Sequence, residues 1–175
     1  MPVANPFIDY AGHGLSRPEC VLAHVSGMLF VPDWTGSGGI SAIVPDGTVK
    51  RHLAKNAPLT LRPNGIALAG GDVLLVHLGA EDGGVWRLRP DGSVDLEIGE
   101  VDNVALPPSN FCHVDGQGRK WLSVSTRHVP RAGAYRNDIR DGFIVLSDER
   151  GTRIAADGLG YTNECLVHPD GKRLF

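Results

Sequence analysis

Cysteine is scarce in this sequence, and its placement argues against a disulfide framework. The 175 residues include 3 cysteines, Cys20, Cys112 and Cys165, and no Cys-x-x-Cys pair occurs. An odd number leaves at least one thiol unpaired in any disulfide scheme. Free thiols are typical of a reducing compartment, so we predict a cytoplasmic protein. A soft thiolate site is one interpretation of the cysteines, and packing as small apolar residues is the other.

Long apolar runs and blocks of one charge are also missing. No stretch approaches the ~18 consecutive apolar residues of a membrane helix, and residues 1–6 lack the basic and apolar regions of a secretory signal. The 17 Lys and Arg stand against 20 Asp and Glu, for a net charge of −3, with no basic cluster. We therefore expect neither a membrane nor nucleic acid as the main partner.

Glycine and proline, by contrast, are abundant. The chain has 23 Gly and 12 Pro among 175 residues, against averages of about 7% and 5%. Short apolar or alternating runs stop at Gly, Asp or Pro, and few segments show helical periodicity. Such runs predict strands, and their number predicts an all-β fold. The runs are Val21–Val25, Met28–Val31, Ile40–Val44, Val73–His77, Val85–Leu88, Trp121–Val124 and Phe143–Leu146.

The turn residues recur with a period of about 45 residues. Gly-Gly-x₅-Pro-Asp-Gly occurs at 38–47 and again 45 residues later at 83–92, and Pro-Asp-Gly, a hairpin signal, returns at 169–171. A second series of turn glycines has spacings of 44, 47 and 53 residues, at Gly27, Gly71, Gly118 and Gly171. Two interleaved hairpins per repeat imply four antiparallel strands, which is the size of a β-propeller blade. A β-sandwich with coincidental turn spacing is the alternative.

The repeat length changes how the chain length is interpreted. About three and a half blades fit, with approximate boundaries at 19–63, 64–109, 110–162 and a partial 163–175. A propeller removes its sheet edges by closing into a ring, so an incomplete ring leaves an apolar flank uncovered. We expect one incomplete propeller domain over 1–175, completed by further chain or by self-association, and a fragment is the favoured interpretation.

Polar residues share this period. Seven or eight residues before each turn glycine of the second series stand Glu19, Asn64, Asn110 and Asn163. Equivalent positions at the start of innermost strands point into the same end of a propeller channel, so we expect these side chains to converge. Ca²⁺ takes six to eight oxygen ligands, including carboxylates and Asn carbonyls. The alternative is that each Asn only caps a turn. One carboxylate is little charge compensation, so a second is expected from another blade.

Four segments resemble successive signatures of the senescence marker protein/gluconolactonase/luciferin-regenerating enzyme family. They are Arg-Pro-Glu at 17–19, Arg-Pro-Asn-Gly at 62–65, Pro-Ser-Asn at 108–110 and Thr-Asn-Glu at 162–164. The resemblance spans about residues 15–175, roughly the first half of that family's six-bladed propeller. It implies hydrolysis of lactones and related esters with one divalent cation, Ca²⁺, Zn²⁺ or Mg²⁺. It matches Glu19 and Asn163 to metal ligands, Asn110 to metal and substrate, and Asn64 more weakly to the metal.

The sequence departs from the family pattern at the substrate side of the site. The family often has Asn-Asp where this chain has Asn110-Phe111, and often Arg where it has Pro108. These changes remove polar groups, so we expect a less sugar-like and more apolar ligand. The family's second carboxylate ligand would lie in the next blade, after Phe175.

Two further residues are candidates for the chemistry. His113 follows Asn110 by three residues and is the histidine to test as a catalytic group, although a structural strand histidine is the alternative. Arg127 stands at a predicted strand end and could bind a substrate carboxylate with two hydrogen bonds, although a surface arginine is the alternative. No general base is evident in this half of the propeller.

These observations lead to one preferred function and two alternatives. We predict metal-dependent hydrolysis of a small lactone or ester, in which the cation polarises the carbonyl and activates water. A non-catalytic propeller that binds a ligand or protein is the main alternative, because propellers are common scaffolds. An enzyme of the same architecture with another reaction, like strictosidine synthase, is the other.

Overall fold

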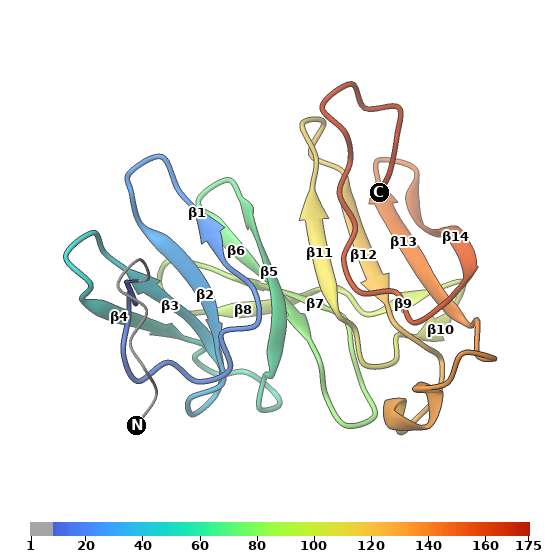
Figure 1. The fold of residues 1–175 in the computed structure, drawn as a ribbon, viewed down its shortest axis with the longest axis horizontal. Coiled ribbons are helices and arrows are strands. Elements are labelled where there is room, and N and C mark those ends of the chain that lie inside the picture. Colours follow the sequence, from blue (N-terminus) through green and yellow to red (C-terminus); the bar gives the residue numbers. More distant parts are fainter. Residues whose placement is uncertain (1–8) are drawn as a thin grey trace.

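The computed structural model describes residues 9–175, and nearly all of its regular structure is β-strand. Three antiparallel sheets of four strands follow one another along the chain (Figure 1). The first contains β1 (Leu22–Ala23), β2 (Leu29–Asp33), β3 (Gly39–Ile43) and β4 (Val49–Leu53). The second contains β5 (Pro63–Ala69), β6 (Asp72–His77), β7 (Val85–Leu88) and β8 (Val94–Ile98). The third contains β11 (Phe111–Val114), β12 (Lys120–Val124), β13 (Gly142–Asp148) and β14 (Gly151–Leu159).

Two small elements lie outside the three four-stranded sheets. The hairpin of β9 (Glu100–Val101) and β10 (Val104–Ala105) lies between the second and third sheets in the chain, and η1 (Arg131–Ala134) is a 3₁₀ turn between β12 and β13. Within residues 9–175 no helix is long and apolar enough to cross a membrane. Strand order in every sheet follows the sequence, so one repeat makes one four-stranded blade and the predicted blade architecture is confirmed.

The repeated Pro-Asp-Gly motifs close the outer hairpins of the first two blades. The Asp46 carboxylate accepts the Thr48 N–H at 2.8 Å, and the Asp91 carboxylate accepts the Ser93 N–H at 2.8 Å. Gly47 follows with a φ of 86°, a conformation that residues with a Cβ rarely adopt. The predicted turn chemistry is therefore what sets the strand register in both hairpins.

The hydrophobic core lies between blades rather than within one. Leu74 and Val76 of β6 pack toward the third blade, whereas Val73 and Leu75 pack toward the first. Successive side chains of a strand point to opposite faces, so a strand covered on both faces must be apolar throughout. This explains the uninterrupted apolar run in β6.

The innermost strands approach each other closely at Gly65. A Cβ at this position would lie 2.7 Å from the Phe111 Cα and 2.9 Å from the Asn110 carbonyl oxygen. No side chain fits there, so glycine allows β5 and β11 to meet beside the central channel.

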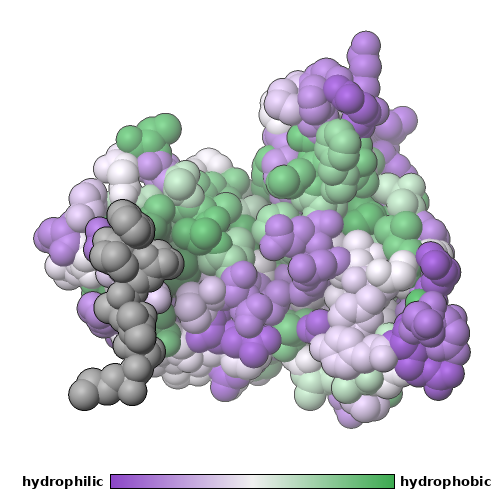
Figure 2. All heavy atoms as spheres, in the orientation of Figure 1, coloured by the Kyte–Doolittle hydropathy of each residue, from purple (hydrophilic) through white to green (hydrophobic). Residues whose placement is uncertain are grey.

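Apolar side chains remain exposed on this partial ring. They gather around a notch between the two halves of the view in Figure 2. Among the large apolar side chains exposed to solvent are Val21 and Val25 next to β1, and Leu166 and Phe175 in the last segment. Such surfaces are consistent with a propeller that needs more chain to cover them.

Candidate functional site

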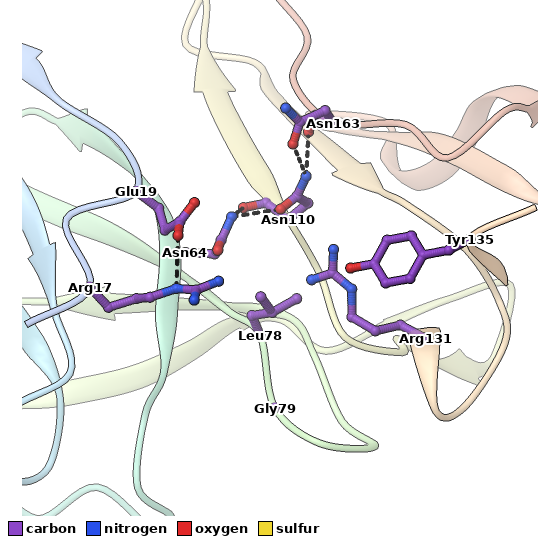
Figure 3. Close-up of a pocket in the computed structure, with 9 residues that line it drawn as sticks. All are labelled: Arg17, Glu19, Asn64, Leu78, Gly79, Asn110, Arg131, Tyr135 and Asn163. Carbon is purple, nitrogen blue, oxygen red and sulfur yellow. Dashed lines mark hydrogen bonds and ion pairs between the residues drawn. The ribbon is translucent and has the colours of Figure 1, made fainter. Parts of the chain in front are cut away.

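A polar cavity of about 410 Å³ lies where the innermost strands begin. Glu19, Asn64, Asn110 and Asn163 all line it, so the residues that share a register in the sequence do converge (Figure 3). The cavity is called the channel site below. Its complete lining is Arg17, Glu19, Asn64, Leu78, Gly79, Asn110, Arg131, Tyr135 and Asn163.

A β-bulge directs Asn64 into the channel site. Pro63 pairs with His77 and Ile66 pairs with Leu75, so β5 carries one residue more than β6 over this stretch. A bulge turns a side chain away from its regular direction. Asn64 therefore faces the channel while the residues after it return to the regular alternation.

Three asparagine side chains form a hydrogen-bonded chain across the site, called the amide relay below. Asn64 Nδ2 donates to Asn110 Oδ1 at 2.6 Å. Asn110 Nδ2 in turn donates to the side-chain oxygen of Asn163 at 2.5 Å and to its backbone oxygen at 2.9 Å. The middle residue, Asn110, is only 3% exposed. Its side chain is held on one side by Asn64 and on the other by Asn163.

Ser123 of β12 forms hydrogen bonds to the backbone on both sides of the amide relay, at the start of β11 and in the segment after β14. Its hydroxyl donates to the Asn163 backbone oxygen at 2.5 Å and accepts the Phe111 N–H at 3.2 Å. Its backbone oxygen accepts the Asn110 N–H at 2.9 Å. One buried serine thus ties the segment after β14 to the start of β11.

An arginine orients the one carboxylate of the channel site. Arg17 Nε lies 2.9 Å from Glu19 Oε1, and both side chains are about half exposed. The Arg17 guanidinium also lies over the Trp34 ring, 5.1 Å from its centroid. Arg17 has a φ of 60°, which is uncommon for a residue with a Cβ. This indicates that the backbone here is held in an unfavourable conformation to place the Arg17 side chain. Sequence reasoning did not identify Arg17 as part of the site.

The segment between β12 and β13 supplies two further polar groups. Arg131 and Tyr135 reach the channel site from the side opposite Glu19 (Figure 3). Arg131 Nε donates to the Tyr161 hydroxyl at 2.8 Å, and the Tyr135 and Tyr161 rings lie 4.7 Å apart. Phe111, in contrast, is buried and does not line the cavity. Arg131 and Tyr135 thus supply polar groups to this side of the cavity, and the expectation of a less sugar-like, more apolar ligand stays a prediction.

The structure does not bring His113 to the channel site. His113 is the third residue of β11 and pairs with Trp121. At about 3.3 Å per residue, it lies roughly 10 Å farther along the strand than Asn110. Burial lowers the pKa of His113, which favours the neutral imidazole. The residue does not line the cavity.

Arg127 lies elsewhere too, with its guanidinium already engaged. It pairs with both Asp157 carboxylate oxygens at 2.8 and 3.0 Å and stacks on the Phe143 ring at 4.2 Å. It lines a separate cavity of about 530 Å³. A substrate carboxylate would have to displace Asp157 to bind it.

The donor set of the channel site is made of oxygen atoms. Across residues 9–175 no group of three or more His, Cys, Asp and Glu side chains is placed to hold a metal. The nearby thiols do not change this, because burial raises the pKa of Cys112 and of Cys165 to about 12. One carboxylate and three amide oxygens fit a hard cation such as Ca²⁺ better than Zn²⁺, which prefers nitrogen and sulfur.

Comparison with known proteins identifies the fold. No protein-family model and no curated protein sequence matches the chain. A gluconolactonase from Xanthomonas campestris matches in structure with a TM-score of 0.63 and 19% identity, over 85% of this chain and 50% of that one. A chain from a nidogen/laminin complex matches with a TM-score of 0.58 and 15% identity, over 90% of this chain and 56% of that one.

These matches establish a shared architecture. At identities of 19% and 15% they concern the fold alone. The chain spans about half the length of each matched structure. It is an arc of a β-propeller, and the resemblance to the gluconolactonase family seen in the sequence motifs is matched by the fold of a gluconolactonase.

Proposed function

We propose that this chain forms part of a metal-dependent hydrolase of small lactones or related esters. The observation that supports the proposal is the convergence of Glu19, Asn64, Asn110 and Asn163 on one polar cavity. These four side chains would hold one divalent cation, with Ca²⁺ first and Mg²⁺ or Zn²⁺ as alternatives. Turn-capping alone would not require residues from four distant segments to meet.

The residues of the channel site have distinct tasks in this proposal. A cation bound there would supply the Lewis acidity that polarises a substrate carbonyl. Asn110, buried and bonded on both sides, fixes the positions of its two neighbours, so the site is preorganised. Arg131 and Tyr135, on the opposite wall, can donate hydrogen bonds to the carbonyl oxygen, which becomes negative when water adds to the carbonyl carbon.

A general base is the remaining requirement. Glu19 is the one carboxylate that lines the described cavity, and it is assigned to the cation. No histidine lines the cavity either. We therefore expect both the base and a second carboxylate ligand from residues outside these 175, so the activity belongs to the complete propeller.

A binding module without catalysis is the second candidate. The structural match to a chain from a nidogen/laminin complex supports this candidate, because the same fold occurs there in an assembly of proteins. A strictosidine synthase-like reaction is a third. The polar channel site favours the hydrolase, because a binding surface does not need a carboxylate and three hydrogen-bonded amides in one cavity.

The test uses the complete protein with Glu19→Gln, and Glu149→Gln in the exposed turn after β13 as its matched control. Calcium binding is followed by isothermal titration calorimetry, and hydrolysis of glucono-lactone and γ-butyrolactone by proton release. We expect Glu19→Gln to abolish both and Glu149→Gln to change neither. Hydrolysis that survives both chelation and Glu19→Gln would overturn the mechanism. Calcium binding without turnover of any lactone or ester would favour the binding module.

The thiols are consistent with the predicted cytoplasmic location, which stays a prediction. All three cysteines are unpaired. The exposed apolar side chains beside β1 and in the last segment would be covered by the remaining part of the propeller, or by a second copy of the chain.

A further inference from the structure

A second cavity adjoins the channel site and has the opposite character. It measures about 530 Å³, within the range of ~300–1,000 Å³ typical of small-molecule sites. Its floor is apolar and buried, with Phe143 at 2%, Leu106 at 3% and Val101 at 6% exposure. Its rim carries Val104 and Val129, which are 65% and 45% exposed. It is called the apolar cavity below.

Two chain segments form a wall of both cavities. In the β6–β7 loop, Leu78 and Gly79 line the channel site, while Glu81 and Asp82 line the apolar cavity. In the segment after β12, Val129 lines the apolar cavity, while Arg131 lines the channel site. Residues two positions apart in a chain are at most about 7 Å apart. The two cavities are therefore neighbours, and Figure 3 shows both segments at the edge of the channel site.

The shared wall is held in place by hydrogen bonds. Gly79 N–H donates to the Asp82 backbone oxygen, and Gly83 N–H donates to the Leu106 oxygen, both at 3.0 Å. At the base of the loop, buried His77 accepts the Arg62 N–H at 2.9 Å. On the other side Arg127 is fixed by Asp157 and Phe143. A preformed wall loses little freedom on binding, so its contacts contribute to affinity.

The charges at the rim of the apolar cavity favour an uncharged ligand. Glu81, Asp82 and Asp102 are exposed carboxylates that line the apolar cavity. The positive charge of Arg127 is already balanced by Asp157. An anionic chain end would be repelled, whereas an uncharged hydrocarbon chain would bury against Phe143, Leu106 and Val101.

We propose that the apolar cavity binds the alkyl chain of a substrate whose lactone or ester group occupies the channel site. This inference rests on the proposed function for the position of the reacting group, and it names the substrate class: neutral lactones or esters with an alkyl chain. Each methylene buried in such a cavity raises kcat/KM by up to about fourfold.

The experiment compares γ-butyrolactone, γ-octalactone and γ-dodecalactone with the complete protein. Ala105→Trp fills the apolar cavity from β10, and Val104→Asp places a charge at its rim. Thr60→Asp, at an exposed site before β5 that lines neither cavity, is the matched control. We expect kcat/KM to rise with chain length in the parent protein and in Thr60→Asp. In the two cavity variants, the ratio between γ-dodecalactone and γ-butyrolactone should fall by at least about tenfold.

A binding measurement separates the inference from the proposed function. Displacement of the uncharged dye N-phenyl-1-naphthylamine by γ-dodecalactone, but not by decanoate, is expected in the parent protein and lost in the cavity variants. If γ-butyrolactone is hydrolysed but chain length has no effect, the inference is wrong and the hydrolase stands. If no lactone is hydrolysed, the hydrolase fails. In that case dye displacement that is lost in the two variants supports the alkyl-chain site, and absence of displacement overturns it.

Discussion

The amide relay makes Asn110→Asp an informative substitution. The two side chains have the same shape, but the new oxygen cannot donate to the Asn163 oxygens, which lie 2.5 and 2.9 Å from Asn110 Nδ2. A hydrogen bond contributes about 1 kcal/mol net, and facing oxygens also repel. Asn163 is exposed, so water offsets part of the loss. We expect the free energy of unfolding without cation to fall by about 1–3 kcal/mol.

The same substitution should strengthen binding of calcium. It would add a second carboxylate to the channel site, and calcium affinity rises with the number of charged ligands. Excess Ca²⁺ would then restore much of the lost stability, because a ligand that binds only the folded state stabilises it. Stability should thus drop in EDTA and recover in calcium, relative to the parent protein.

The assay is urea unfolding of the complete protein in EDTA and in excess Ca²⁺, with calcium titration calorimetry alongside. With a slope of about 3 kcal/mol per molar urea, the midpoint in EDTA should fall by about 0.3–1 M. Asn137→Asp, exposed and outside both cavities, is the control. An equal midpoint for Asn110→Asp and Asn137→Asp would refute the energetic role of the relay. Weaker calcium binding by Asn110→Asp would refute the placement of Asn110 among the ligands.

Three further predictions concern the packing and charge of the blades. Gly65→Ala should cost about 1–3 kcal/mol in urea unfolding, because its Cβ would meet the Phe111 backbone at 2.7 Å; Gly116→Ala, which has open space around it, should be nearly neutral. Hydrogen bonds from Arg87 and then Lys120 lower the pKa of Glu97 to about 2. Its stabilising effect is present above pH 4.5 and lost as the pH falls toward 2, so Glu97→Gln should flatten the stability profile in that window, and an unchanged slope would contradict the pairing. Burial lowers the pKa of His77 below its ordinary 6.5, so the free energy of unfolding should decline as the pH falls below 6.5. His77→Asn can still accept the Arg62 N–H and should remove that decline, measured by calorimetric melting between about pH 7 and 5. A pH profile equal to that of the parent protein would count against this role of His77.

The blade architecture could be predicted because turns and core strands carry strong local signals. Pro-Asp-Gly at 45–47 and 90–92 forms the same aspartate-capped turn in both copies, and residues 73–76 of β6 are all apolar because both faces of the strand are covered. The outermost strands form no continuous apolar run. Three of the five residues of β4 are polar, and β8 alternates apolar and polar residues, so only the repeat implied these two strands.

The channel site could be predicted only as far as it is periodic. Glu19, Asn64, Asn110 and Asn163 occupy equivalent places in successive repeats, and equivalence in a propeller means convergence. Arg131 and Tyr135 come from an insertion that breaks the period, so their place in the cavity depends on how that segment folds back. His113, in contrast, was a candidate only because it follows Asn110 by three residues. In an extended strand, three residues correspond to a separation of about 10 Å, so His113 does not reach the cavity.

The role of Arg127 is decided by its neighbours in the fold. Its position at a strand end indicated a substrate carboxylate, but the partner it needs is supplied by Asp157 of β14 in the same blade. Its guanidinium lies over Phe143, which forms the floor of the apolar cavity, so the residue contributes to the wall rather than binding an anion. The repeated positions supply the proposed oxygen ligands Glu19, Asn64, Asn110 and Asn163, whereas the non-repeated loops supply Arg131, Val129 and Arg127. For the proposed hydrolase we therefore expect substrate choice to change with the loops while these four ligands keep their places.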